Sequence, residues 1–171
     1  MMGKPNIVLT GFMGTGKTTI GKLLAESLGY AFIDTDERIE RQAGKTIPEI
    51  FEEEGEEAFR EMEAALAREL AERQGVVIAT GGRMMLDPGN AAALSRTGHV
   101  FCLAAAPEEI LERITRDTAT RRPLLAVADP MERIRSLLRQ RQHGYRRFPQ
   151  LVTSGIPPEA VVDILHAMLK R

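Results

Sequence analysis

The chain has 171 residues, of which 43% are hydrophobic and 27% are charged, and its formal net charge at pH 7 is −1. These values are typical of one globular domain with a single sizeable core, and the net charge gives no indication of a surface for nucleic acid or an anionic membrane. The apolar run at residues 7–9 is too short for a signal sequence or a membrane span, and the single cysteine, Cys102, cannot form an internal disulfide. We therefore expect a cytoplasmic protein in which Cys102 occupies a buried strand.

A glycine-rich loop follows the first expected strand, at residues 7–9, and a helical pattern begins directly after it. The sequence from Gly11 to Thr18 fits the pattern G-x-x-x-x-G-K-[ST]. Glycines let the backbone N–H groups of such a loop point at a phosphate, and the following helix N-terminus adds unpaired N–H groups. Lys17 can reach the β- and γ-phosphates, and the Thr18 hydroxyl can bind Mg²⁺. The alternative is a turn that binds nothing, but the position between strand and helix favours a nucleoside triphosphate site.

Short apolar runs alternate with longer helical patterns along the rest of the chain. We expect further strands at residues 31–33, 76–79, 100–103 and near 151–152. Helices are expected from the glycine loop to about residue 28, at 46–73 with a break at Gly55, from residue 87 or 88, at 107–116, at 130–145 and at 158–169. Residues 117–128 have no clean periodicity and are expected to form a mobile loop. The alternation predicts a single α/β domain, residues 1–171, with a parallel sheet between two helical layers.

Two carboxylates, Asp34 and Asp36, follow directly after the second expected strand. Open α/β sheets bind ligands beyond the carboxyl ends of their strands. If the chain is extended there, both side chains point to the same side, one toward a metal-bound water and one toward a substrate hydroxyl. The alternative is a helix N-cap followed by an acidic first turn. The nearby glycine loop favours the functional interpretation.

Arg60, Gly81 and Gly82 each have an ordinary interpretation beside a functional one. Glu56 and Glu63 lie at helical spacing from Arg60, so this arginine could simply balance an acidic helix face. The two glycines follow an expected strand, and they either let a ligand approach the backbone or form a turn.

Arginines are frequent in the last third of the chain. Arg122 lies in the expected loop and could hold phosphoryl charge when that loop closes, or it could belong to a solvated basic loop. Arg141 lies in a basic helix in which most arginines are expected to be solvated. The three histidines are scattered and show no metal-ligand spacing.

The ordered set of motifs resembles that of the shikimate kinase family over residues 7–169. The motifs are the glycine loop, D-T-D at 34–36, F-R-x-x-E at 59–63, G-G at 81–82, R-P-L-L at 122–125 and a late helix with Arg141 and Tyr145. The resemblance implies transfer of the γ-phosphoryl group of ATP to the 3-hydroxyl of shikimate, in the route to chorismate and aromatic amino acids. It also implies a five-stranded parallel sheet in the order 2-3-1-4-5, a lid at about 117–128, substrate-binding helices at about 36–63 and a monomer.

The resemblance also implies which residues bind ATP and Mg²⁺. Thr18 would bind the metal directly, and Asp34 would hold it through water. Either Arg113 or Arg116 would pack near the adenine. The full set implied for ATP is Gly14, Thr15, Gly16, Lys17, Thr18, Thr19, Arg113, Arg116 and Arg122.

For the substrate, the resemblance implies a carboxylate-and-hydroxyl site. Arg60 would bind the shikimate carboxylate, and Glu63 would orient Arg60. Asp36 would bind hydroxyls and is the candidate base at the 3-hydroxyl. The implied substrate-binding set is Asp36, Arg60, Gly81, Gly82 and Arg141, and the implied catalytic set is Lys17, Asp36 and Arg122.

Two positions depart from the family pattern. Arg83 stands where a third glycine is usual, and its side chain must either point away from the substrate pocket or enter it, adding positive charge or narrowing the site. His143 stands where a proline is usual. Neither change removes a catalytic group, but both bear on the choice of substrate.

Three other functions are compatible with the glycine loop. They are a kinase for another small polyol acid such as gluconate, a kinase for a nucleotide, and a nucleotide-binding regulator without transfer activity. Arg60 and Arg141 suit a carboxylate rather than a nucleotide acceptor. The presence of the whole motif set argues against the regulator.

Overall fold

The computed structural model describes residues 3–117 and 126–171, and within these ranges five strands form one parallel sheet. The strands are β1 (Asn6–Thr10), β2 (Ala31–Asp34), β3 (Val76–Ala79), β4 (Gly98–Ala104) and β5 (Gln150–Val152). Their order is β2-β3-β1-β4-β5, and every neighbouring pair is parallel. The expected order 2-3-1-4-5 is therefore confirmed.

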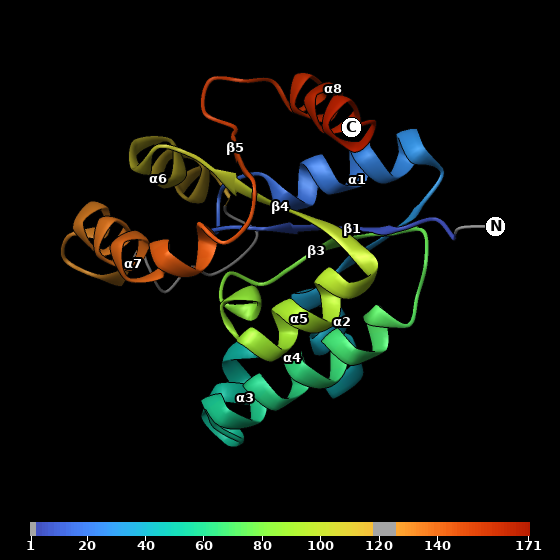
Figure 1. Cartoon of the computed structure of the whole chain (residues 1–171). Coiled ribbons are helices and arrows are strands. Elements are labelled where there is room, and N and C mark those ends of the chain that lie inside the picture. The colour runs from blue at the N-terminus through green and yellow to red at the C-terminus, as the bar shows by residue number, and fades with distance from the viewer. Residues whose placement is uncertain (1–2, 118–125) are drawn as a thin grey trace.

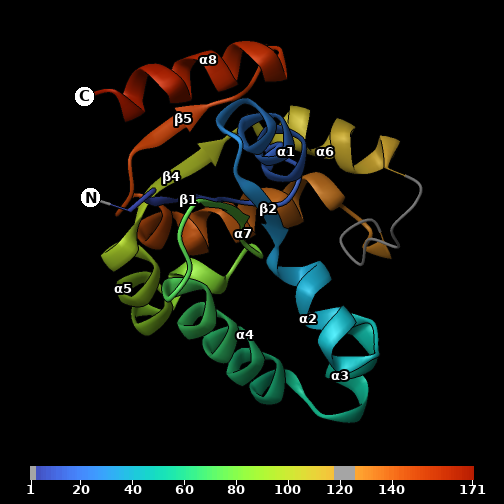
Figure 2. The same cartoon turned by 90° about the vertical axis from the view of Figure 1, so that its right-hand side faces the viewer.

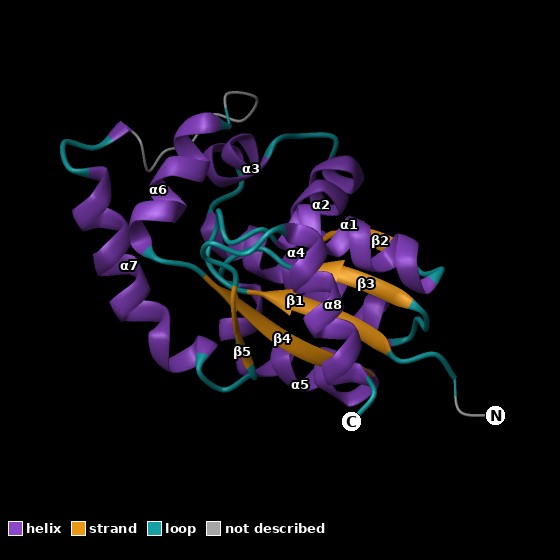
Figure 3. Ribbon diagram, turned by 90° about the horizontal axis from the view of Figure 1, so that it is seen from above, coloured by secondary structure: helices purple, strands orange, loops and turns teal. Residues whose placement is uncertain are grey.

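Helices cover both faces of this sheet (Figure 1). Helices α1 (Lys17–Leu28) and α8 (Pro158–Leu169) lie side by side on one face, and α4 (Glu56–Ala71) and α5 (Pro88–Thr97) pack together on the other. Figure 2 shows α2 (Thr35–Ala43) and α3 (Ile47–Glu53) next to α4, on the same side of the sheet. Figure 3 shows α6 (Pro107–Arg116) and α7 (Pro130–Tyr145) together at one side of the sheet. The expected three-layer α/β/α arrangement is confirmed.

The side chains of β1 show how the sheet divides the core. Ile7 and Leu9 pack with α1 and α8, whereas Val8 packs with α4 and α5. All three are at most 2% exposed. Successive side chains of a strand point to opposite faces, so a strand buried on both faces reads as a continuous apolar run. Cys102 is also buried in a strand, as expected.

Local signals in the sequence explain most of the helix boundaries. Gly55 has φ +90 and separates α3 from α4 at the expected break. The Asp87 side chain accepts from the N–H groups of residues 89 and 90 and begins α5. Thr46 and Glu49 form a reciprocal capping box at the start of α3. The 3-10 helix η1 (Met84–Leu86) was not predicted, because three residues are too few to show a period.

No helix in the two described ranges combines the length and the apolarity that crossing a bilayer demands.

Asn6 links three parts of the fold through one buried side chain. Its amide nitrogen donates to the carbonyls of Leu70 (3.2 Å) and Arg73 (2.8 Å), and its oxygen accepts from the N–H of Val76 (3.1 Å). The residue is 1% exposed. The amide therefore ties the end of α4 and the start of β3 to β1.

We predict that Asn6→Ala lowers the free energy of unfolding by about 2–4 kcal/mol, because it leaves buried backbone groups without partners. Urea unfolding followed by circular dichroism measures this change. The exposed Gln42→Ala serves as the control, with an expected change within about 0.5 kcal/mol. A loss below about 1 kcal/mol for Asn6→Ala would contradict the assigned role.

Candidate active site

The glycine loop connects β1 to α1 and has a conformation that its glycines make possible. Gly11, Gly14 and Gly16 all have positive φ, and Gly16 is the N-cap of α1. A Cβ on Gly11 would lie 2.3 Å from the carbonyl oxygen of Leu103, so only glycine fits there. The loop therefore lies at the carboxyl end of β1, directly before a helix N-terminus. This is the arrangement that binds phosphate groups.

Lys17 is the first residue of α1, and its side chain folds back over the loop. Its Nζ donates to the carbonyl oxygens of Gly11 (2.7 Å) and Phe12 (2.8 Å). The ammonium group thus lies at the loop, where it would meet a phosphate group bound there. Thr15 is buried and its hydroxyl donates to the Phe12 carbonyl, whereas Thr19 is exposed on α1.

Thr18 and Asp34 are brought together from two elements. The Thr18 hydroxyl donates to Oδ2 of Asp34 over 3.0 Å. The other oxygen of Asp34 accepts from the N–H of Glu37 (3.1 Å) and caps α2. Asp34 therefore is a helix N-cap and also faces the glycine loop.

This pair of oxygen ligands fits Mg²⁺, which prefers oxygen donors and keeps several of its waters. Among residues 3–117 and 126–171, no group of three or more His, Cys, Asp and Glu side chains is placed to hold a metal ion. A site with one hydroxyl and one carboxylate suits a cation that also binds phosphate oxygens.

Asp36 lies in the first turn of α2, so the chain is not extended there. The extended geometry considered for residues 34–36 is wrong, because β2 ends at Asp34 and the Asp34 side chain caps a helix at once. The two carboxylates nevertheless lie near each other. Burial raises the pKa of Asp36 to about 6, and the charges of Asp34 and Glu63 add to this rise, whereas Lys17 opposes it.

Gly81 brings the loop after β3 against the half-buried carboxylate of Asp36 and the buried carboxylate of Glu63. A Cβ on Gly81 would lie 2.6 Å from Oδ1 of Asp36 and 3.3 Å from Oε2 of Glu63. The N–H of Gly81 donates to the Thr35 hydroxyl (2.9 Å), which fixes this close approach. A larger residue at position 81 would displace Asp36.

Arg60 projects from α4 and is held between two glutamates. Its Nη1 donates to Glu63 (2.6 Å), which is 1% exposed, and its Nη2 donates to Glu56 (3.2 Å), which is half exposed. Burial raises the pKa of Glu63, and the contact with Arg60 opposes this rise. Arg60 therefore balances two acidic neighbours, as its ordinary interpretation states. Its partner Glu63 also lies next to Gly81 and Asp36, so Arg60 is linked to these residues through Glu63.

Arg141 reaches the same region from α7. Its guanidinium lies over the ring of Phe12, 5.3 Å from the centroid. A Cβ on Gly82 would lie 3.2 Å from Nη1 of Arg141. On the same helix, the Tyr145 hydroxyl donates to the Gly82 carbonyl over 2.5 Å. Gly81 and Gly82 thus lie between the carboxylates of α2 and α4 and the guanidinium of α7.

The structure distinguishes between the two arginines of α6. Arg113 donates to the carbonyl of Gly14 (3.0 Å) and to the carbonyl of Thr153 (3.3 Å), so it joins the glycine loop to the segment after β5. Arg116 is 73% exposed and pairs with Glu112. Arg122 lies outside the described residues.

The two departures from the family pattern also have defined places. His143 is exposed on α7. Arg83 forms an ion pair with Glu56, because its Nη1 donates to Oε1 of Glu56 over 2.9 Å. Its side chain therefore neither points away from the site nor enters it as an unpaired charge.

Three residues at the site were given no role in the sequence analysis. Phe12 supports Arg141, Tyr145 binds the loop at Gly82, and the Thr153 hydroxyl donates to the Thr15 carbonyl (2.8 Å). Thr153 follows β5 directly, so its place at the carboxyl end of a strand is the signal that identifies it. Phe12 lies inside the glycine motif at a position where the pattern accepts any residue.

The comparisons with known proteins agree with this geometry. The shikimate kinase family model matches residues 13–169. The chain is 50% identical over 167 residues to the shikimate kinase of Caldanaerobacter subterraneus subsp. tengcongensis, with 96% of both chains covered. The chain belongs to the shikimate kinase family. It is therefore an ATP-dependent kinase, and the family expected from the motifs is confirmed.

Solved structures give the same family. Shikimate kinase from Acinetobacter baumannii, solved in complex with shikimate, superposes with a TM-score of 0.87 at 42% identity and covers 98% of this chain and 94% of its own. A gluconokinase from Sinorhizobium meliloti reaches a TM-score of 0.58 at 20% identity, covering 99% of this chain and 98% of its own. The second likeness shows the fold alone.

The raised pKa of Asp36 predicts a gain in stability when its charge is removed. A carboxyl whose pKa rises on folding opposes folding once it is ionised, so its cost is absent well below pH 3.8 and complete above about pH 6. We expect Asp36→Asn to raise the free energy of unfolding at pH 8 by about 1–2 kcal/mol and to lose this advantage near pH 4.

Thermal unfolding of the purified chain at both pH values measures this effect. Asp163→Asn, at an exposed position of α8, is the control and should change stability equally little at both pH values. An Asp36→Asn variant less stable than the parent at pH 8 would show that the ionised carboxylate is favourable in the fold.

Proposed function

We propose that the chain transfers the γ-phosphoryl group of ATP to the 3-hydroxyl of shikimate, giving shikimate 3-phosphate and ADP. The observation that carries this proposal is that Asp36 and Arg141 lie against the loop at Gly81 and Gly82, next to the glycine loop, and that Arg60 joins them through Glu63. Two arginines suit a carboxylate, and the aspartate suits hydroxyl groups. Family membership and the likeness to a shikimate-bound structure support the same substrate.

ATP is proposed to bind with its phosphates on the glycine loop. The N–H groups of Gly14, Thr15 and Gly16 and the ammonium of Lys17 would surround the β- and γ-phosphates, next to Thr18 and Thr19 at the start of α1. The contacts of Arg113 with Gly14 and Thr153 favour it over Arg116 as the arginine beside the nucleotide. Arg122 is retained as the proposed lid arginine, in a lid at about residues 117–128.

Mg²⁺ is proposed to bind between Thr18 and Asp34, whose oxygens lie 3.0 Å apart. When bound, the metal supplies charge neutralisation at the phosphate oxygens. Thr18 would bind it directly and Asp34 would hold it through water. The cap that Asp34 forms on α2 fixes the carboxylate in place for this role.

The substrate is proposed to lie against the helices at about residues 36–63, with its carboxylate toward Arg60 and Arg141. Asp36 would accept the proton of the 3-hydroxyl while the oxygen of that hydroxyl forms a bond to the γ-phosphorus. The bond from the γ-phosphorus to the bridging oxygen then breaks and ADP leaves. A base with a pKa of about 6 is ionised near neutral pH and still basic enough to accept this proton. The ammonium of Lys17 would stabilise charge on the transferring group.

Other properties stay proposals, of which the monomer follows from the family resemblance and the rest from composition and charge. We propose a cytoplasmic location and a monomer, with no nucleic-acid or membrane partner. Sedimentation velocity over a range of protein concentrations tests the monomer directly.

A coupled assay of ADP release tests the proposed reaction. With MgATP, we expect ADP release to depend on shikimate and to stay at background with gluconate or with nucleoside monophosphates. In the same assay, Lys17→Ala should reduce the rate of the shikimate reaction at least about 100-fold, because one main phosphate contact is lost.

ADP release with gluconate and not with shikimate would show that the acceptor is another polyol acid. ATP binding without release from any acceptor would favour a regulator.

The role of Asp36 predicts the pH dependence of the rate. Because the ionised form accepts the proton, kcat/KM for shikimate should rise with pH and level off above an apparent pKa of about 6. Asp36→Asn should lower kcat by about 10²–10⁴-fold and remove this acidic limb. Steady-state rates between pH 5 and 9 test both expectations. An Asp36→Asn variant that keeps kcat and the same pH profile would remove Asp36 from the chemistry.

A further inference from the structure

Arg83 connects the loop after β3 to the first turn of α4. Its Nη1 donates to Oε1 of Glu56 over 2.9 Å, and both side chains are about half exposed, 51% and 53%. The preceding residue, Gly82, lies against Arg141. The positive charge of Arg83 also acts to lower the pKa of the buried Glu63. Arg83 therefore lies at the rim of the proposed substrate site, within electrostatic reach of its interior.

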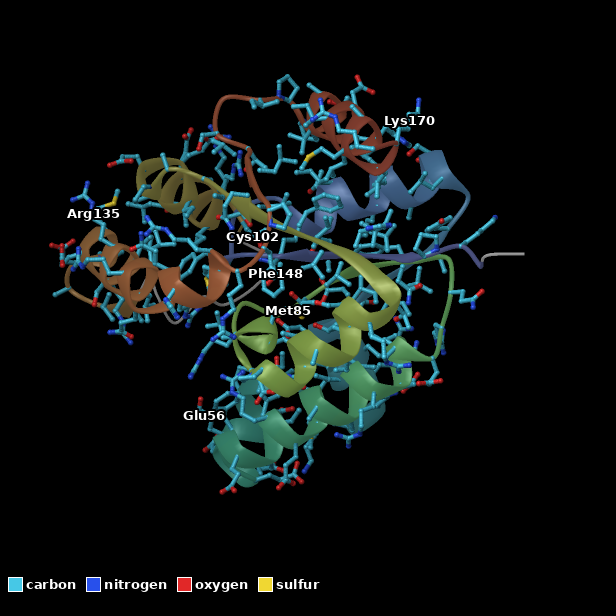
Figure 4. All side chains as sticks on the ribbon, viewed as in Figure 1. Glu56, Met85, Cys102, Arg135, Phe148 and Lys170 are labelled. Carbon is cyan, nitrogen blue, oxygen red and sulfur yellow. The ribbon has the colours of Figure 1, made fainter. Side chains whose placement is uncertain are left out.

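Glu56 is shared by two arginines through one oxygen atom. Oε1 accepts from Nη1 of Arg83 (2.9 Å) and from Nη2 of Arg60 (3.2 Å). Figure 4 labels Glu56 at the margin of the molecule, which agrees with its half-exposed side chain. The buried partner of Arg60 is Glu63, at 2.6 Å from Nη1. In this structure both terminal nitrogens of Arg60 thus contact a carboxylate.

The charges around Arg60 decide whether a third carboxylate can approach it. Without Arg83, the single charge of Arg60 would face the two negative charges of Glu56 and Glu63, so these three groups together would be negative. Arg141 lies on the other side of Gly82 and contacts none of the three. With Arg83, the four groups have two positive and two negative charges. Glu56 also keeps a cationic partner if Nη2 of Arg60 turns away from it.

We infer that Arg83 is a positioning residue that holds Glu56 while Arg60 exchanges this glutamate for the carboxylate of the substrate. The inference rests on the proposed function, in which Arg60 binds that carboxylate. Nη1 of Arg60 stays on the buried Glu63, and Nη2 becomes the donor to the substrate. Arg83 thereby favours acceptors that have a carboxylate over neutral polyols, although it does not itself contact the substrate.

The test is a double-mutant cycle at positions 83 and 56, with KM from steady-state rates and Kd for shikimate from calorimetry without nucleotide. Arg83→Ala should raise both constants about threefold to tenfold, as expected for one half-exposed charge acting over a few ångströms, and should change kcat by less than about twofold. Arg83→Lys, which keeps the charge, should restore most of the affinity. In a Glu56→Gln background, Arg83→Ala should change KM by less than about twofold, because the carboxylate at position 56 that Arg83 holds is no longer there.

Two controls separate this role from a structural one. Arg96→Ala removes a similarly exposed arginine that pairs with Glu72 at 3.0 Å, far from the site, and should leave KM unchanged. The neutral amide of shikimate should show no dependence on Arg83, because it has no carboxylate to which Arg60 could donate in place of Glu56. Thermal unfolding of each variant confirms that the fold is retained.

The outcomes are distinct. An unchanged KM in Arg83→Ala, an equal rise in the Glu56→Gln background, or an equal rise for the amide would each overturn the role of Arg83. In all three cases an active parent chain leaves the proposed function intact. A parent chain that neither binds nor phosphorylates shikimate would instead overturn the proposed function, and the inference with it.

Discussion

Parallel pairing is the constraint on which the site depends. Because the described strands run in one direction, their carboxyl ends meet at one edge of the sheet, and the residues that follow them are brought together. Gly11 follows β1, Asp34 ends β2, Gly81 follows β3 closely and Thr153 follows β5. No single segment of the chain contains the site. The register between strands, together with the helices that fix it, places each of these residues beside the others.

The site concentrates negative charge, and its arginines make this possible. Asp36 and Glu63 lie close together in a half-buried or buried setting, which raises the pKa of each. Such a pair opposes folding unless cations lie near it. Arg60 contacts Glu63 directly, and Lys17 acts on Asp36. The same cations suit an anionic substrate and a polyphosphate, so the groups that neutralise the protein's own carboxylates are those that its proposed ligands need.

Much of the fold could be predicted from the sequence because its boundaries are marked by local chemistry. Gly29 and Gly55 have positive φ at helix ends, and Asp87 caps α5. The conformation of residues 34–36 was harder to predict, because the sequence D-T-D is compatible both with an extended strand end and with the first turn of a helix. Only the structure shows that the Asp34 side chain caps a helix and that α2 begins at the next residue.

The motif order predicted which residues belong to a site, but not the contacts between them. Arg141 on Phe12 and Arg83 on Glu56 join residues far apart in the chain, and no periodicity relates them. For Arg83, the sequence left two directions open, toward the pocket or away from it. The observed ion pair is a third arrangement, and it depends on where the first turn of α4 lies relative to the loop after β3.

The environment of Cys102 has a practical consequence. Figure 4 places this residue in the interior of the molecule, where it is 1% exposed, and burial raises the pKa of its thiol to about 11. A thiol that is both covered and protonated reacts slowly with alkylating reagents. Because the chain has no other cysteine, one introduced at a chosen surface position would be the single reactive thiol. The unaltered chain is thus already a suitable background for attaching a spectroscopic label at one introduced cysteine, or a pair of labels at two, and for following motions of the molecule in solution.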